Sequence, residues 1–242
     1  MIKGLLFDLN GTLIDIMTNE YDDNVYRITA NFLSYYGVNI SPETLKEKYF
    51  FLNRKQRNES REEFPEFDSA KIFYDIISEF SSHPEENIVR LSKYASRVYR
   101  ASTRFKLQLY PGVYNTLEIL LLRKFQMAAL TDGQSLWAVP ELKVCGINNF
   151  FSFSIVSGDY GFRKPDKRLF DAAMEKFALP SEEILFVGND MYRDVYGAKR
   201  AGLKCVFFKS NQGEQNFCGK EPDYIIYNFP QLIEAIEFLS RN

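Results

Sequence analysis

Two aspartates, a threonine and a lysine follow short apolar segments of this chain, and these side chains are the ones best suited to chemistry. Asp8 comes directly after residues 2–7, Thr131 after 127–130, Lys164 in the loop beyond 153–156 and Asp190 after 184–187. A carboxylate can attack an anionic phosphate ester only when a divalent cation and a fixed ammonium offset the repulsion. Asp8 and Asp190 offer oxygen ligands for such a cation, and Lys164 offers the ammonium.

The elements that must position these residues are parallel strands. The four apolar segments, together with 204–208 and 224–226, are separated by helix-length stretches, which is typical of β-α-β units. Helical spacing begins near Val113 and recurs over 167–177, 191–201 and 230–239. We expect an α/β fold with a doubly wound, Rossmann-like parallel sheet, in which ligands bind at the carboxyl ends of the strands.

Between about residues 17 and 104 the pattern changes from strands to amphipathic helices. Stretches such as 21–35 and 71–80 carry aromatic residues at helical spacing and are separated by polar breaks. A chain of 242 residues has room for one α/β core and one insert. We therefore expect a core formed by residues 1–16 and 105–242 and an inserted all-helical cap domain formed by residues 17–104.

Four motifs of the chain resemble those of the haloacid dehalogenase-like superfamily and stand in the same order. They are Asp8-x-x-Gly11-Thr12-Leu13 after a strand, a strand that ends in Thr131, the pair Lys164-Pro165, and Gly188-x-Asp190-x-x-x-Asp194-x-x-Gly197-Ala198. The resemblance covers essentially the whole core. It implies a Mg²⁺-dependent hydrolase of small phosphate esters, with the insert acting as a cap that covers the site.

The resemblance also assigns roles to individual residues. Asp8 is the expected nucleophile, which forms an aspartyl-phosphate that water hydrolyses. Asn10, Thr131 and Lys164 are the other expected catalytic residues. The expected substrate-binding residues are Leu9, Gly11, Asp132 and Gly133. The expected Mg²⁺ ligands are Asp8, Asn10, Asp190, Asn189 and Asp194, with Asp190 as the charged ligand beside Asp8 and with helix capping an equal alternative for Asp194.

Asn10 departs from the family pattern. Family phosphatases carry a second aspartate at this position as general acid and base, whereas an amide has no proton to exchange near neutral pH. Loss of general acid–base catalysis lowers a rate by about 10²–10⁴-fold, so we expect weakened rather than abolished turnover. Three explanations of Asn10 remain open. The residue is an engineered substitution, the chain is a natural family member of low activity, or its reaction needs no general acid. Asn189 and Asp132 also differ from the residues common in the family.

Competing functions use the same residues. A non-catalytic phosphate-binding protein of this fold fits Asn10, and a haloacid dehalogenase releases halide without protonating it. A phosphomutase needs an acid–base relay that Asn10 does not supply. Taken singly, each residue also has a purely structural explanation. Asp8 and Thr131 are common where a strand ends, and Lys164 could be a solvated charge in a polar loop. Their joint placement after separate strands favours the enzyme.

Composition limits the partners. The net charge of -2 provides no basic field for nucleic acid or an anionic membrane, so we expect a small phosphorylated substrate. The three cysteines lack CxxC spacing and no apolar run is long enough to span a membrane, which favours a cytoplasmic protein. A basic cluster in the insert either contacts the substrate or is a solvated helix face; it consists of Arg54, Lys55, Arg57 and Arg61. The oligomeric state is not indicated.

Overall fold

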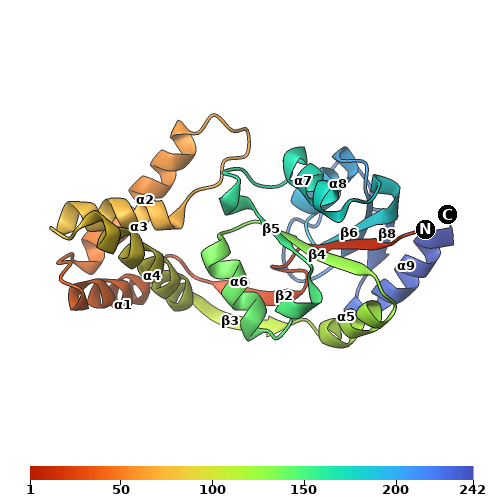
Figure 1. The fold of residues 1–242 in the computed structure, drawn as a ribbon, viewed down its shortest axis with the longest axis horizontal. Helices are drawn as coiled ribbons and strands as arrows, with labels where there is room; N and C mark the ends of the chain where they lie inside the picture. Colours follow the sequence, from red (N-terminus) through yellow and green to blue (C-terminus); the bar gives the residue numbers. More distant parts are fainter. Residues whose placement is uncertain (242) are drawn as a thin grey trace.

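A six-stranded parallel sheet, in the order β5-β4-β1-β6-β7-β8, forms the centre of the protein (Figure 1). The structure is a computed structural model and describes residues 1–241. The strands are β1 (Gly4–Phe7), β4 (Gln126–Thr131), β5 (Ser154–Val156), β6 (Ile184–Gly188), β7 (Lys204–Phe208) and β8 (Tyr224–Ile226). Each coincides with a predicted apolar segment to within about two residues. The predicted parallel α/β sheet is confirmed.

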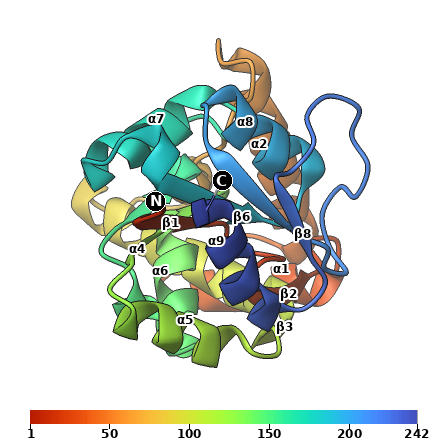
Figure 2. The same ribbon diagram turned by 90° about the vertical axis from the view of Figure 1, so that its right-hand side faces the viewer.

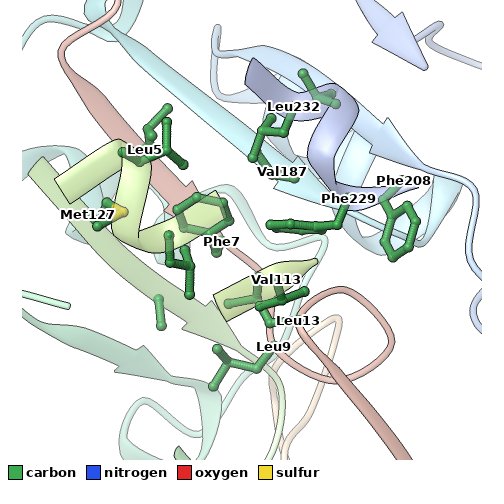
Figure 3. Close-up of a cluster of buried hydrophobic side chains, with 14 of the residues drawn as sticks. Leu5, Phe7, Leu9, Leu13, Val113, Met127, Val187, Phe208, Phe229 and Leu232 are labelled. Atoms are coloured by element: carbon green, nitrogen blue, oxygen red, sulfur yellow. The ribbon is translucent and has the colours of Figure 1, made fainter. Parts of the chain in front are cut away.

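Both faces of the sheet are buried, because successive side chains of each strand point to opposite sides. In β1, Leu5 and Phe7 join one apolar cluster and Leu6 joins the other. Figure 3 shows the first cluster, where Phe7 packs beside Val187 of the next strand and Phe229 of the C-terminal region. Burial of this kind contributes about 1.5–3 kcal/mol for each large apolar side chain, and it fixes the register of the strands.

Helices cover the two faces of the sheet separately. On one face lie α5 (Val113–Leu122), α6 (Ser135–Val144) and α9 (Leu232–Arg241). On the other face lie α7 (Lys167–Phe177), a π-helical segment (Met191–Tyr196) and α8 (Gly197–Arg200), as Figure 2 shows from the end of the sheet. The predicted helix over 191–201 is therefore broken into two parts. The sheet is doubly wound, as expected.

The remaining four helices form a separate unit, drawn on the left of Figure 1. They are α1 (Asp23–Tyr35), α2 (Pro42–Glu59), α3 (Ser69–Phe80) and α4 (Glu85–Thr103). Asp22, Ser41 and Asp68 each accept a hydrogen bond from the first turn of a helix, which fixes where α1, α2 and α3 begin. The unit has its own apolar cluster, centred on aromatic residues such as Tyr49 and Tyr99. Within residues 1–241, no helix combines the length and apolar character that crossing a membrane requires.

Two strands that the sequence analysis did not predict connect this helical unit to the core. The strands β2 (Ile14–Thr18) and β3 (Arg104–Leu109) pair with each other in antiparallel fashion. Their residues are only partly buried in β3 and in the last part of β2, so they do not form the apolar run that marks a central strand. The chain enters and leaves the helical unit along this two-stranded ribbon.

Candidate active site

Asp8, Lys164 and Asp194 meet at the carboxyl end of β1. The Lys164 ammonium donates to Asp8 Oδ1 and to Asp194 Oδ1, each at 2.6 Å. All three residues are at most 5% exposed. The topology explains the meeting, because the carboxyl ends of neighbouring parallel strands share one edge of the sheet. Asp8 and Asp194 lie 156 and 30 positions from Lys164 in the sequence, and the Lys164 Nζ atom joins them in the fold.

The charges of this group do not balance. Burial alone would lower the pKa of Lys164, but Asp194 and Asp8 outweigh it and raise that pKa above its ordinary value. Burial raises the pKa of the Asp194 carboxyl to about 7 despite the nearby Lys164, and the charge of Asp8 adds to the rise. Two buried carboxylates therefore share one ammonium. The site favours the arrival of a further positive charge.

Thr12 fixes the second oxygen of the candidate nucleophile. Its hydroxyl lies 2.9 Å from Asp8 Oδ2 and 3.0 Å from Asn189 Oδ1, and it is fully buried. Asn189 in turn donates from Nδ2 to the carbonyl of Gln212 at 2.9 Å. The Asp8 carboxylate is thus oriented by Lys164 on one side and by Thr12 on the other. Thr12 was part of the recognised motif, but the sequence analysis assigned it no role.

Asp190 does not face this group. Its Oδ1 accepts from the backbone N–H groups of Tyr192 and Arg193, and its Oδ2 accepts from the Arg193 guanidinium and from the backbone of Glu214. Burial opposes ionisation, but these donors prevail and hold the pKa of Asp190 below its ordinary value. The carboxylate of Asp190 is thus directed to the turn after β6, and its role as the leading charged metal ligand stays a prediction. Its neighbours Asn189 and Asp194 are the ones that face Asp8.

Asp194 accounts for the shape of the turn after β6. Its Oδ2 accepts from the backbone N–H groups of Asn189 and Asp190, each at 3.0 Å, while its Oδ1 holds Lys164. A Cβ atom at Gly188 would lie 2.5 Å from the Asp194 carboxylate, so only glycine permits this approach. Asp194 thus binds the turn that precedes the helix and belongs to the charged group, whereas the residue that caps the helix is Asp190. The metal-ligand role predicted for Asp194 stays a prediction.

Thr131 and Asp132 lie at the end of β4, beside the charged group. Thr131 is buried, and its hydroxyl is 3.3 Å from the carbonyl of Asp132. The Asp132 carboxylate accepts from the backbone N–H of Lys164 at 2.9 Å, which holds the loop that carries the ammonium. The structure brings both residues to the site. Asp132 thus positions the Lys164 loop, a role that was not predicted for it. Its predicted contact with substrate stays a prediction.

The loop after the nucleophile offers fewer free donors than predicted. Leu9 buries its side chain in the core, and the N–H of Gly11 already donates to Ile14 at 2.8 Å. Within residues 1–241, the backbone N–H groups of Leu9 and Asn10 donate to no protein acceptor. Gly11 has φ of 91°, and a Cβ there would lie 2.3 Å from Asn189 Nδ2. Gly11 therefore allows the backbone to approach the Asn189 side chain closely, and its N–H is not free to bind a ligand.

Gly133 belongs to a set of contacts that fasten the helical unit to the core. Its N–H donates at 2.8 Å to the hydroxyl of Ser157, which itself donates to the Glu66 carboxylate at 2.7 Å. Two backbone bonds, from Glu66 to Gly161 and from Arg163 to Phe64, reinforce the junction. No motif in the sequence predicts these contacts, since they join segments that are far apart in the chain and share no pattern. The segment between α2 and α3 is thereby held against the loop that carries Lys164.

A cavity of about 430 Å³ lies between the helical unit and the core. Asp132, Gly133 and Arg163 line it from the core, beside the charged group, and residues of α2 and α4 line it from the helical unit. Its volume falls within the range of about 300–1,000 Å³ typical of small-molecule sites. The site therefore combines a buried, oriented carboxylate with an adjoining cavity of the size of small-molecule sites.

Residues 5–208 match the sequence profile of the haloacid dehalogenase-like hydrolase family. The chain belongs to this family. The hydrolase is 25% identical to the glyceraldehyde 3-phosphate phosphatase of Methanocaldococcus jannaschii over 100% of both chains. It is 33% identical to the enzyme of that name from Pyrococcus furiosus over 52% of this chain and 54% of the relative. It is 25% identical to the phosphoglycolate phosphatase of Agrobacterium fabrum, over 96% and 91%.

Solved structures share the fold of this haloacid dehalogenase-like hydrolase. A 2-haloacid dehalogenase from Pseudomonas syringae pv. Tomato superposes with a TM-score of 0.70 at 21% identity, covering 98% of this chain and 99% of the other. A haloacid dehalogenase-like phosphatase from Thermococcus onnurineus gives 0.60 at 22% identity, covering 97% and 98%. At such identities the likeness concerns the fold alone.

The donor set of the hydrolase fits a hard divalent cation. Asp8, Asp194 and Asn189 present carboxylate and amide oxygens, the ligands that Mg²⁺ prefers. Two buried carboxylates with one ammonium leave a negative charge that such an ion would offset. Among residues 1–241, no group of three or more His, Cys, Asp or Glu side chains is gathered as metal ligands. A bound Mg²⁺ would thus depend on amide, backbone and substrate oxygens as well as carboxylates.

Proposed function

We propose that this hydrolase removes phosphate from small phosphate monoesters through a covalent intermediate on Asp8. The observation that carries the proposal is the geometry of Asp8, a buried carboxylate with one oxygen held by Lys164 and the other by Thr12. Curated relatives that match the whole chain are named as phosphatases, which supports the same reaction. The Asp8 carboxylate attacks phosphorus, the bond from phosphorus to the ester oxygen breaks, and water later hydrolyses the aspartyl-phosphate.

Each neighbouring residue contributes to this reaction through charge or position. The Lys164 ammonium offsets the negative charge that accumulates when Asp8 meets the phosphoryl group. Thr12 keeps the carboxylate aligned, while Thr131 and the free N–H groups of Leu9 and Asn10 are placed to donate to phosphoryl oxygens. A bound Mg²⁺, held by Asp8, Asn189 and Asp194, would supply further neutralisation of the phosphoryl charge. We propose this set in place of one led by Asp190.

Asn10 limits the rate in this proposal. The ester oxygen leaves as an alkoxide that needs a proton, and water needs a base when it attacks the intermediate. An amide supplies neither, so both steps depend on solvent. The expected loss is about 10²–10⁴-fold relative to a chain with a carboxyl group at this position.

We also propose that residues 17–104 act as a cap. The helical unit closes one side of the cavity and is fastened to the core by contacts such as Ser157 to Glu66. Closure of this kind excludes water and strengthens the electrostatic interactions inside. The substrate would enter when these contacts open and the unit moves on the ribbon of β2 and β3.

The test compares hydrolysis of 4-nitrophenyl phosphate by the unsubstituted chain, Asn10→Asp and Asp8→Ala, with Mg²⁺ and with a chelator. We expect Asn10→Asp to raise turnover by about 10²–10⁴-fold, Asp8→Ala to abolish it, and the chelator to abolish it in both active chains. Mass spectrometry controls for deamidation at Asn10-Gly11, which would create the same carboxyl group. Full activity of Asp8→Ala would contradict the proposed mechanism.

Asn10 also favours a second candidate, the hydrolysis of a carbon–halogen bond. Halide is a stable leaving group and needs no proton, so the amide would not slow the first step. Halide release from 2-chloropropanoate, measured beside phosphate release, separates the candidates. Halide release that stops in Asp8→Ala, without any phosphate release, would favour the dehalogenase.

A further inference from the structure

The cavity beside the active site gathers polar groups that lack partners. Within residues 1–241, four buried side-chain polar atoms have no hydrogen-bond partner. Three of them belong to residues that line this cavity: Arg57 Nε, Tyr99 Oη and Asp132 Oδ2. A buried polar atom without a partner is destabilising, because it has lost its hydrogen bonds to water and gained none in the protein. Arg57 Nε is a free donor at the cavity wall and indicates a ligand that presents an acceptor, whereas Asp132 Oδ2 is itself an acceptor and lies 3.5 Å from Arg163 Nε.

Two guanidinium groups face this cavity from opposite sides. Arg57 comes from α2 in the helical unit, and Arg163 comes from the core loop before Lys164. Both residues line the same cavity. Burial lowers the pKa of Arg57, and the positive charge of Arg163 lowers it further. Like charges are held together here by the junction of the helical unit with the core, where the Arg163 N–H donates to Phe64.

The acids near these cations neutralise them incompletely. The nearest carboxylate oxygen to Arg57 is Glu66 Oε1 at 3.8 Å, and Glu66 is already bonded to Ser157. Arg163 Nε lies 3.5 Å from Asp132 Oδ2, an ion pair without a hydrogen bond. Both guanidinium groups thus keep donors available. An oxyanion between them would satisfy those donors and relieve the repulsion.

Aromatic rings form much of the remaining wall. Tyr49, Phe67, Tyr99 and Trp137 all line the cavity, and Trp137 is fixed by a bond from its Nε1 to Ser96. Rings of this kind bind a flat or apolar molecular body.

We infer that the substrate carries a second oxyanion, remote from its phosphate, on an apolar body, and that Arg57 and Arg163 bind this oxyanion. The inference rests on the proposed phosphatase function and specifies its substrate class. Arg57 and Arg163 act here as specificity residues, since they contact the part of the substrate that does not react. Of the predicted basic cluster, Arg57 and Arg54 line the cavity, whereas Lys55 lies outside it.

The first test needs no variant. It compares kcat/KM for phenyl phosphate, 4-carboxyphenyl phosphate, 1,4-phenylene bisphosphate and 4-(aminomethyl)phenyl phosphate. We expect the carboxylate or the bisphosphate to exceed phenyl phosphate by about 10–100-fold, the usual effect of hydrogen bonds to a charged group, and the amine to fall below it. The first two arms distinguish a carboxylate from a second phosphate. Equal values for the neutral and anionic esters would overturn the inference.

The second test assigns the preference to Arg57. Arg57→Gln should remove most of the anionic preference, measured as the ratio of kcat/KM for the anionic ester to kcat/KM for phenyl phosphate. Lys55→Gln removes the same charge from the same helix outside the cavity and should keep the preference. An unchanged preference in Arg57→Gln, with the fold verified by circular dichroism, would overturn the assignment.

A binding experiment separates this inference from the proposed reaction. Asp8→Asn lacks the nucleophile, so calorimetry can measure the binding of intact phenyl phosphate and 4-carboxyphenyl phosphate. Tighter binding of the carboxylate, lost in the double variant with Arg57→Gln, supports the inference even if no ester is hydrolysed. Hydrolysis of all esters without such a difference would leave the proposed function standing and refute the inference.

Discussion

Removing the ammonium of Lys164 would leave two buried carboxylates without their shared cation. In Lys164→Met, Asp8 and Asp194 lose bonds of 2.6 Å at positions that are at most 5% exposed. Breaking a buried ion pair by removing one partner typically costs about 3–5 kcal/mol. For a protein of this size that loss corresponds to a fall in Tm of roughly 6–20 °C.

The same variant should show a distinctive pH dependence. The pKa of Asp194 in the folded protein is about 7, above the value of about 3.9 of an unfolded aspartate. Protonation therefore favours the folded state, and this contribution is complete below about pH 3.9 and lost as the pH rises through about 7. Without Lys164, whose charge lowers the pKa of Asp194, that pKa rises further. The destabilisation by Lys164→Met should be larger at pH 8 than at pH 5, by at least about 1 kcal/mol, or roughly one pKa unit.

Urea unfolding followed by circular dichroism, at pH 5 and pH 8 without divalent ions, measures both quantities. Lys167→Met is the matched control, since Lys167 pairs with Asp171 on the surface, where both side chains are more than 40% exposed. The control should lose no more than about 0.5 kcal/mol, with little dependence on pH. A loss below about 1 kcal/mol in Lys164→Met, or an equal loss at the two pH values, would refute the reasoning.

Two further predictions concern the surroundings of the site. Gly213→Ala should lower stability by about 2–5 kcal/mol and reduce turnover, because φ is 79° and the new Cβ would lie 2.6 Å from the carbonyl oxygen of Asn189. Gly202→Ala is the control, because φ is 83° there but no atom lies within 4 Å of the new Cβ. Its stability should fall by only about 1–2 kcal/mol, with activity kept. Equal losses of stability in the two variants would argue against a close contact at Gly213. Ser157→Ala breaks the bond to Glu66 and should raise KM and speed proteolysis of residues 60–68, whereas unchanged cleavage would show that this bond does not fasten the helical unit.

The sheet was predictable because its strands are buried on both faces. A strand such as β6 is a short continuous apolar run between helical segments, which is typical of a parallel strand buried on both faces. The strands β2 and β3 escaped prediction for the opposite reason. They pair only with each other, and part of each is exposed, so no uninterrupted apolar segment marks them.

The site was predictable as a set and unpredictable in its details. Residues after parallel strands had to share one edge, and this brought Asp8, Lys164 and Asp194 together. The choice between the adjacent residues Asn189 and Asp190 depended on how the chain turns after β6. There the backbone N–H groups and Arg193 bind Asp190 and turn it from the nucleophile. No residue pattern encodes that orientation.

Thr18 and Arg104 are paired across the β2–β3 ribbon, and the N–H of Asn19 donates to the carbonyl of Thr103 just beyond them. Opposed residues of an antiparallel pair have Cα atoms only about 4.5–5.5 Å apart, a distance that a two-residue turn can bridge. The whole helical insertion could thus be excised at one point and its ends rejoined as a hairpin, without displacing any strand of the sheet. A scaffold of this kind accepts grafted modules of other lengths at the same junction, so recognition can diversify while the reacting groups stay where they are.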